Sequence, residues 1–262
     1  MNQDEVSEPL SRYRRRALGS RARPIKLAQL RQEGELRIDL KRGRWLPFTA
    51  GKVVKPMDVA FEWDARVRFA PFIHIRVQDA YDGGEGAARV SVLSAITIAE
   101  KRGSAELNSG SLFRFLAEAP WYPSVLVPSE KLCWKLIDSS RATATLTDHD
   151  ITVELEFRFD SAGDVAAIYA ASRPRKVAAG YEMAAWEGHF DDYGEREGLR
   201  CRFEGKLAGM PTGLGRACGA DESSAPVTNL PRNAFSLSVR YPRQSRGLVS
   251  VSPSKGQKTG VA

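Results

Sequence analysis

The chain has few of the residues on which most metal and nucleophile sites depend. Its 262 residues include three histidines and three cysteines, and Cys133, Cys201 and Cys218 lie far apart. Disulfide frameworks and zinc sites need paired or clustered cysteines, so this spacing favours reduced thiols and no bound metal. We also expect no cofactor and no catalytic motif, because no Walker loop, G-x-S-x-G or G-x-G-x-x-G after a strand is present.

Long apolar runs are missing as well. No stretch approaches the roughly 18 apolar residues that a membrane-spanning helix requires. The first residues, MNQDEVS, are polar and acidic and have no apolar core of the kind found in secretory signals. We therefore expect a cytoplasmic protein without a transmembrane segment.

The positive charge is carried by the two ends of the chain. Of the net +7, residues 1–31 hold eight Lys/Arg against three Asp/Glu, and residues 209–262 hold seven against two, so the segment between them is −3. A nucleic-acid-binding domain needs a dense basic patch on its folded surface. We expect no nucleic-acid partner.

Strict alternation of apolar and charged residues is the clearest pattern present. It runs through FEWDARVRF at 61–69 and returns at 36–40 and 153–160. Because side chains alternate across a strand, each segment has one apolar and one charged face, as is typical of antiparallel sheets that bury one face. The pattern predicts a mostly β protein, built as one curved antiparallel sheet (a half-barrel) of about ten strands.

Two helices accompany the predicted strands. A short N-terminal helix is expected over 8–18, and one internal helix over 105–119, where Arg114 and Glu118 are spaced as a surface ion pair and Pro120 ends the helix. Strands are expected near 25–40, 45–54, 58–69, 72–81, 86–98, 131–138, 141–147, 150–160, 164–172, 184–194 and 199–207. The glycine pair at 83–84 predicts a tight hairpin turn.

The chain changes character near residue 208. Residues 209–262 are rich in Gly, Ser, Pro and Arg and lack a sustained period, apart from FSLSV at 235–239. Such a segment buries too little apolar surface to offset its ordering entropy. We predict a single β half-barrel domain over 1–208 and a disordered tail over 209–262.

Candidate site residues fall into an aromatic and a polar group. The aromatic residues either pack the core or line an apolar ligand cavity on the concave side of the sheet, and they are Trp45, Phe48, Trp63, Tyr81, Trp121, Tyr122 and Trp186. The polar group, Glu118, His189 and Asp191, would be needed for an enzymatic site, since a histidine beside carboxylates can act as a general base. Neither pattern excludes a purely structural role.

Five sequence blocks, taken together, resemble an uncharacterised bacterial family, a domain of unknown function. They are WLPFTA (45–50), WDARV (63–67), DAYDGGEG (79–86), RFLAEAPWYP (114–123) and WEGHFDDY (186–193). The resemblance covers about residues 7–205 and implies no known activity. Its layout is similar to the lipoprotein-carrier-like half-barrel, whose concave face takes lipid or acyl chains. That family pattern would continue past Lys206 with a Trp-containing strand, so we interpret residues 209–262 as a shifted reading frame.

The leading functional hypothesis is a non-enzymatic binding module for a lipid-like, apolar or amphipathic small molecule. Two alternatives remain open at this point. One is a hydrolase-like enzyme built on Glu118, His189 and Asp191. The other is a structural protein that docks a partner through an open sheet edge. The sequence carries no signal for the oligomeric state.

Overall fold

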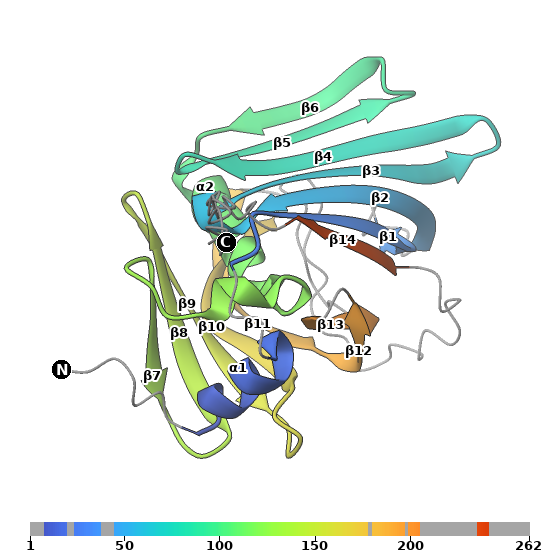
Figure 1. The fold of residues 1–262 in the computed structure, drawn as a ribbon. Helices are drawn as coiled ribbons and strands as arrows, with labels where there is room; N and C mark the ends of the chain where they lie inside the picture. Colours follow the sequence, from blue (N-terminus) through green and yellow to red (C-terminus); the bar gives the residue numbers. More distant parts are fainter. Residues whose placement is uncertain are drawn as a thin grey trace, which may run out of the picture.

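The computed structural model describes residues 8–19, 24–37, 45–177, 180–196, 199–204 and 235–240. Within these residues the protein is mostly β, with two open antiparallel sheets, a small two-stranded sheet and two α-helices (Figure 1). No helix in this part of the chain is long and apolar enough to cross a membrane.

The first sheet follows the chain order. Its strands are β1 (Leu27–Arg37), β2 (Trp45–Lys55), β3 (Ala60–Ala70), β4 (Ile73–Asp82), β5 (Glu85–Val92) and β6 (Ile96–Arg102). Consecutive strands pair in antiparallel register, and a short 3₁₀ turn, η1 (Pro56–Asp58), joins β2 to β3. At the edge, β14 (Phe235–Arg240) pairs antiparallel with β1.

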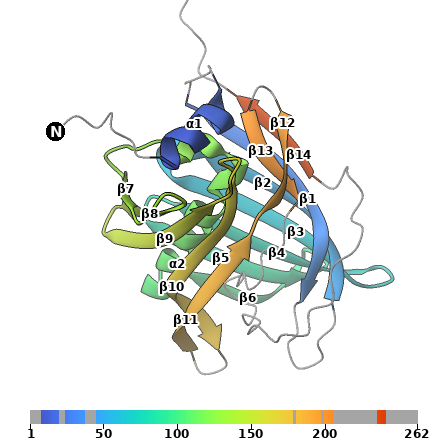
Figure 2. The same ribbon diagram turned by 90° about the horizontal axis from the view of Figure 1, so that it is seen from below.

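The second sheet has the order β11-β10-β9-β8-β7. Its strands are β7 (Leu132–Leu136), β8 (Arg141–Asp148), β9 (Ile151–Phe159), β10 (Val165–Val177) and β11 (Gly180–His189). A separate ribbon of β12 (Asp191–Arg196) and β13 (Leu199–Glu204) follows. Figure 2 shows this ribbon beside β14, and β13 contacts β14.

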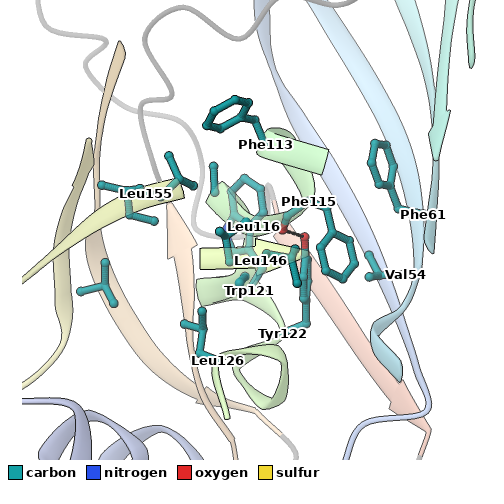
Figure 3. Packing of buried hydrophobic residues seen from close by; sticks show 14 of the residues in the cluster. Val54, Phe61, Phe113, Phe115, Leu116, Trp121, Tyr122, Leu126, Leu146 and Leu155 are labelled. Atoms are coloured by element: carbon teal, nitrogen blue, oxygen red, sulfur yellow. Dashed lines mark hydrogen bonds between the residues drawn. The ribbon is translucent and has the colours of Figure 1, made fainter. Parts of the chain in front are cut away.

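The internal helix α2 (Ala105–Ala117) lies between the two sheets and contacts β4 and β5 on one side and β9 and β10 on the other (Figure 1). Ser104 caps its first turn by accepting a hydrogen bond from the Leu107 amide at 3.3 Å. The 3₁₀ turns η2 (Ala119–Trp121) and η3 (Pro123–Leu126) continue it. Figure 3 shows the apolar side chains that surround this segment, and Tyr122 donates a hydrogen bond to the Phe115 carbonyl at 2.7 Å.

The small helix α1 (Leu10–Leu18) closes one end of the core. Tyr13, Ala17 and Leu18 are buried on one face of this helix, and the Tyr13 ring packs against Phe159 with centroids 5.7 Å apart. The amphipathic spacing that predicted a helix over 8–18 thus corresponds to its docked face.

The expected half-barrel of about ten strands is wrong, because the strands form two open sheets and neither is curled. The physical reason lies in α2. Residues 111–117 of this helix are all buried, so this part of the helix has no solvent-facing side and needs a layer on each side. The chain leaves the first sheet after β6, crosses through α2, η2 and η3, and begins a second sheet at β7. The expected strands over 86–98 and 184–194 also divide, into β5 with β6 and β11 with β12.

A hairpin end connects the two sheets. Gly83 and Gly84 form the β4–β5 turn with φ of +57° and +82°, which confirms the predicted tight turn. A Cβ on Gly84 would lie 3.0 Å from the His149 ring in the β8–β9 turn. Nearby, Tyr81 donates a hydrogen bond to Asp148 Oδ2 across the sheets at 3.0 Å.

Most of the expected tail, residues 209–262, lies outside the described residues. Its one short alternation lies in β14, as a strand of the first sheet.

Candidate functional site

Five formally charged side chains are buried where α2 meets the two sheets. All are less than 8% exposed, and they are Lys52 on β2, Asp79 on β4, Arg114 in α2, Glu118 at its C-cap and Arg173 on β10. Buried charges are costly unless they are paired, so such a group in a core is a candidate site.

Four of the five form a continuous chain of ion pairs. The Lys52 ammonium contacts Glu118 Oε2. Arg114 donates from Nε to Glu118 Oε1 at 3.0 Å and from Nη1 to Asp79 Oδ2 at 2.5 Å. These ion pairs therefore link β2, α2 and β4.

Aromatic rings border these cations. The Lys52 ammonium lies 4.2 Å from the Phe61 ring centroid, and the Arg114 guanidinium carbon lies 4.6 Å from that of Trp63. The negative ring faces stabilise both cations where water is excluded.

Arg173 faces inward because β10 contains a β-bulge. The pairing with β11 shifts register between Ala170 and Arg173. Ala170 is buried, Ala171 and Ser172 are both exposed, and Arg173 is buried again. Simple alternation would place Arg173 on the solvent face together with Ala171, so the bulge turns its guanidinium into the core.

Arg173 has no carboxylate partner in the described part of the chain. Its residue is 5% exposed, and its guanidinium carbon lies 5.3 Å from the Trp186 ring centroid. Within the same residues, no acceptor lies within hydrogen-bonding distance of the buried Trp186 Nε1. Two neighbouring donors thus share an environment without an acceptor for either.

The pKa shifts follow from burial and from this arrangement of charges. Burial, together with the like charge of Arg114, lowers the pKa of Arg173 to about 10. Burial also lowers the pKa of Lys52, where Arg114 again adds repulsion. The pKa of Asp79 is raised by burial despite the opposing effect of Arg114 and Lys52. Losing water therefore outweighs ion pairing at Lys52 and Asp79, while at Arg173 burial and the like charge of Arg114 act in the same direction.

The sequence matches the model of a family of unknown function, DUF6920, over residues 4–208. The chain belongs to this family. No curated protein matches the chain. The expected membership of a domain-of-unknown-function family is thus confirmed.

The aromatic candidates of this DUF6920 member differ in their exposure. Five are buried in the core, Phe48 is half-buried and Trp45 is 51% exposed; the five are Trp63, Tyr81, Trp121, Tyr122 and Trp186. Only Trp63 and Trp186 lie directly over a buried guanidinium.

The polar candidates occupy different environments. Glu118 is 1% exposed and engages Lys52 and Arg114. The side chain of His189 is 71% exposed, and its carboxylate contact is Glu187 Oε1 at 3.4 Å. Asp191 pairs with Glu204 in the β12–β13 ribbon. Arg114 and Glu118 do form the expected pair four residues apart, but the pair is buried and not on the surface.

Sequence reasoning missed Lys52, Asp79 and Arg173. Two of them could have been detected in the sequence. Lys52 falls at the alternating positions of β2 that are otherwise apolar and buried, together with Leu46, Ala50 and Val54. Asp79 likewise continues the inward phase of β4. Arg173 carried no such signal, since the bulge that turns it inward has no mark in the alternation.

Proposed function

We propose that this protein is a non-enzymatic binding module for an amphipathic anion. The acidic head group of the ligand would accept hydrogen bonds from Arg173 and Trp186, and its apolar part would pack against apolar side chains. A long-chain carboxylate or a related acidic lipid has this chemistry.

The observation that carries the proposal is the pair of donors without acceptors. The buried Trp186 indole N–H has no acceptor among the described residues, and the Arg173 guanidinium, whose residue is 5% exposed, has no counter-ion among them. Burial without a partner is costly for both groups. An oxyanion placed between them would accept from both and neutralise the charge of Arg173. A neutral apolar ligand would leave both donors unsatisfied.

The charge balance of the whole cluster supports an anion over a cation. Three formal cations, Lys52, Arg114 and Arg173, face two carboxylates, Asp79 and Glu118. The excess positive charge lies in the core, where charges interact most strongly. One bound carboxylate would bring the cluster to neutrality.

The hydrolase-like alternative has less support. A general base must reach its substrate and be oriented by a neighbouring group. Glu118 is enclosed by two cations, whereas His189 is on the surface beside Glu187. Docking through an open sheet edge has no specific observation in its favour.

The proposal is tested by comparing laurate with dodecanol on the full chain. Laurate is expected to raise the melting temperature and change tryptophan emission, because a ligand that binds the native state alone stabilises it. Dodecanol, with the same chain and no charge, is expected to have a much smaller effect. No response to laurate up to its solubility limit would overturn the proposal.

Arg173→Met separates binding from folding. It replaces the guanidinium with a shorter, flexible and uncharged side chain that remains apolar beside the Trp186 ring, so laurate binding should fall about tenfold or more while the fold is retained. Arg175→Gln is the matched control, because Arg175 lies two residues away and its guanidinium pairs with Glu182. Equal laurate binding by Arg173→Met and the wild type would contradict the assigned site.

A further inference from the structure

Two neighbouring hairpins end in large apolar side chains that face solvent. The β3–β4 and β5–β6 hairpins extend past α2 and the second sheet (Figure 1). Their apolar end residues, here called the hairpin tip, are each at least 42% exposed and are Phe69, Phe72, Ile73, Leu93, Ile96 and Ile98. Exposed apolar residues gathered in this way mark an interaction site on a soluble surface.

The two hairpin ends are held side by side by hydrogen bonds. The Leu93 amide donates to the His74 carbonyl at 2.9 Å, and the His74 and Ser94 side chains are bonded at 3.0 Å. The adjoining strands pair through Ile75 and Val92. The hairpin tip is therefore a single rigid surface at the end of one sheet.

The turn residues are unusual for their backbone conformation. Phe72 is fully exposed with φ +62°, and Leu93 has φ +52°. Turn positions with positive φ favour glycine or asparagine, because a bulky side chain is strained there. At both turns the chain thus carries an exposed apolar side chain against the preference of the backbone.

The charges beside the hairpin tip are all of one sign. Residues 65–78 and 86–99 contain no Asp or Glu, although the segment 32–208 as a whole has a net charge of −3. Arg66 and Arg68 are exposed on β3 beside the hairpin tip. An apolar end flanked only by arginines is complementary to an anionic surface with an apolar interior.

We propose that the hairpin tip inserts into the surface of an anionic lipid bilayer, with the flanking arginines against the head groups. A protruding pair of turns fits this occupant better than a protein partner, because a stable protein interface needs a broad complementary patch of roughly 800 Å² per side. The proposal is independent of the ligand site at Arg173. If both hold, the protein takes up its amphipathic ligand at a membrane.

Cosedimentation of the full chain with vesicles tests this proposal. The protein is expected to bind vesicles of phosphatidylcholine mixed with phosphatidylglycerol, to bind phosphatidylcholine alone weakly, and to be released by salt. A protein that stays in the supernatant with the anionic vesicles would overturn the proposal.

The variant Phe72→Asn/Leu93→Asn removes two apolar side chains at positions whose backbone suits asparagine, so its fold should be at least as stable. Its partitioning to anionic vesicles should fall about tenfold or more. Met57→Ser is the control, because Met57 is 60% exposed on the η1 turn and lies outside the hairpin tip. Equal binding by the double variant would refute the role of the hairpin tip.

Gel filtration of the same proteins distinguishes a protein occupant. A wild-type dimer that becomes monomeric in Phe72→Asn/Leu93→Asn would show that the hairpin tip binds a second copy and would overturn the membrane proposal. A wild type and variant that elute alike, together with loss of vesicle binding, support it.

Discussion

At the scale of single residues, the buried ion pairs are more informative than the aromatic residues. Glu118 is the shared carboxylate of Lys52 and Arg114, and it is almost fully buried. Removing one partner of a buried pair leaves an uncompensated charge, whereas removing both partners can cost little. The cost of a substitution here therefore depends on which charges remain.

Glu118→Gln should lower the free energy of unfolding by about 3–5 kcal/mol, because it leaves Lys52 and Arg114 short of a carboxylate. The double variant Lys52→Met/Glu118→Gln should recover part of that loss. Urea denaturation measures both. Glu85→Gln is the control, since its pair with Arg102 is exposed and should change stability by less than about 1 kcal/mol. If Glu118→Gln lowers the free energy of unfolding no more than the control does, the buried ion pairs do not stabilise the fold as proposed.

At the scale of elements, Asp164 joins three separate segments. It immediately precedes β10, accepts from Arg200 on β13 at 2.7 Å and from Arg16 on α1 at 3.0 Å. Burial alone would raise the pKa of this carboxyl, but hydrogen bonds from Arg200 and Arg16 more than offset it and leave the pKa below its usual value. Close packing supports the same junction, because a Cβ on Gly163 would lie 2.8 Å from Arg12.

Asp164→Asn should therefore destabilise the protein by on the order of 2 kcal/mol near neutral pH. Since the folded-state pKa is depressed, this stabilisation is complete above the unfolded-state pKa of about 3.9 and is lost as the pH falls through the lower folded-state pKa. Urea denaturation should show a wild-type advantage at pH 7 that narrows as the pH falls below the unfolded-state pKa of about 3.9.

Glu8→Gln is the comparison for that experiment, because Glu8, just before α1, pairs with Arg12 and has a side chain that is 61% exposed. It should have little effect at any pH. If the difference in unfolding free energy between the wild type and Asp164→Asn does not change with pH, the charge of the carboxylate does not hold α1 and β13 in place.

At the scale of the whole molecule, one core spans both sheets. The cluster of buried apolar residues runs from Leu10 in α1 to Cys201 in β13, and α2 contacts both sheets. The pairing of β14 with β1 adds an edge strand, and among the residues whose burial is described the core cluster lies within residues 10–201. Unfolding should thus be one cooperative transition, and β14 should protect an edge.

A chain that ends at residue 208 should keep a single thermal transition but associate more readily, because β1 would become an unpaired edge strand. Light scattering and gel filtration measure association, and circular dichroism measures the transition, with the full chain as the control. Loss of the cooperative transition would show that residues 209–262 contribute to the core. Unchanged association would show that β14 does not protect β1.

The sequence alone determined most of the helices and strands. Alternation along β3 and β9 marks strands because the two faces of a strand differ in burial, and Pro120 marks the end of the internal α-helix through sterics. The glycine pair at 83–84 likewise predicted the tight β4–β5 turn. All of these signals act between residues a few positions apart.

Only the tertiary structure decided how the elements combine. Alternation shows that a strand has a buried face, but it does not show which layer covers that face. It therefore could not distinguish two sheets packed around α2 from one curved sheet. The same limit hid the site, because Lys52, Asp79 and Arg114 meet through packing between β2, β4 and α2. Arg173 joins them only because a β-bulge in β10 shifts the alternation by one residue and turns its side chain inward. The bulge depends on the pairing of β10 with β11, which is a tertiary feature.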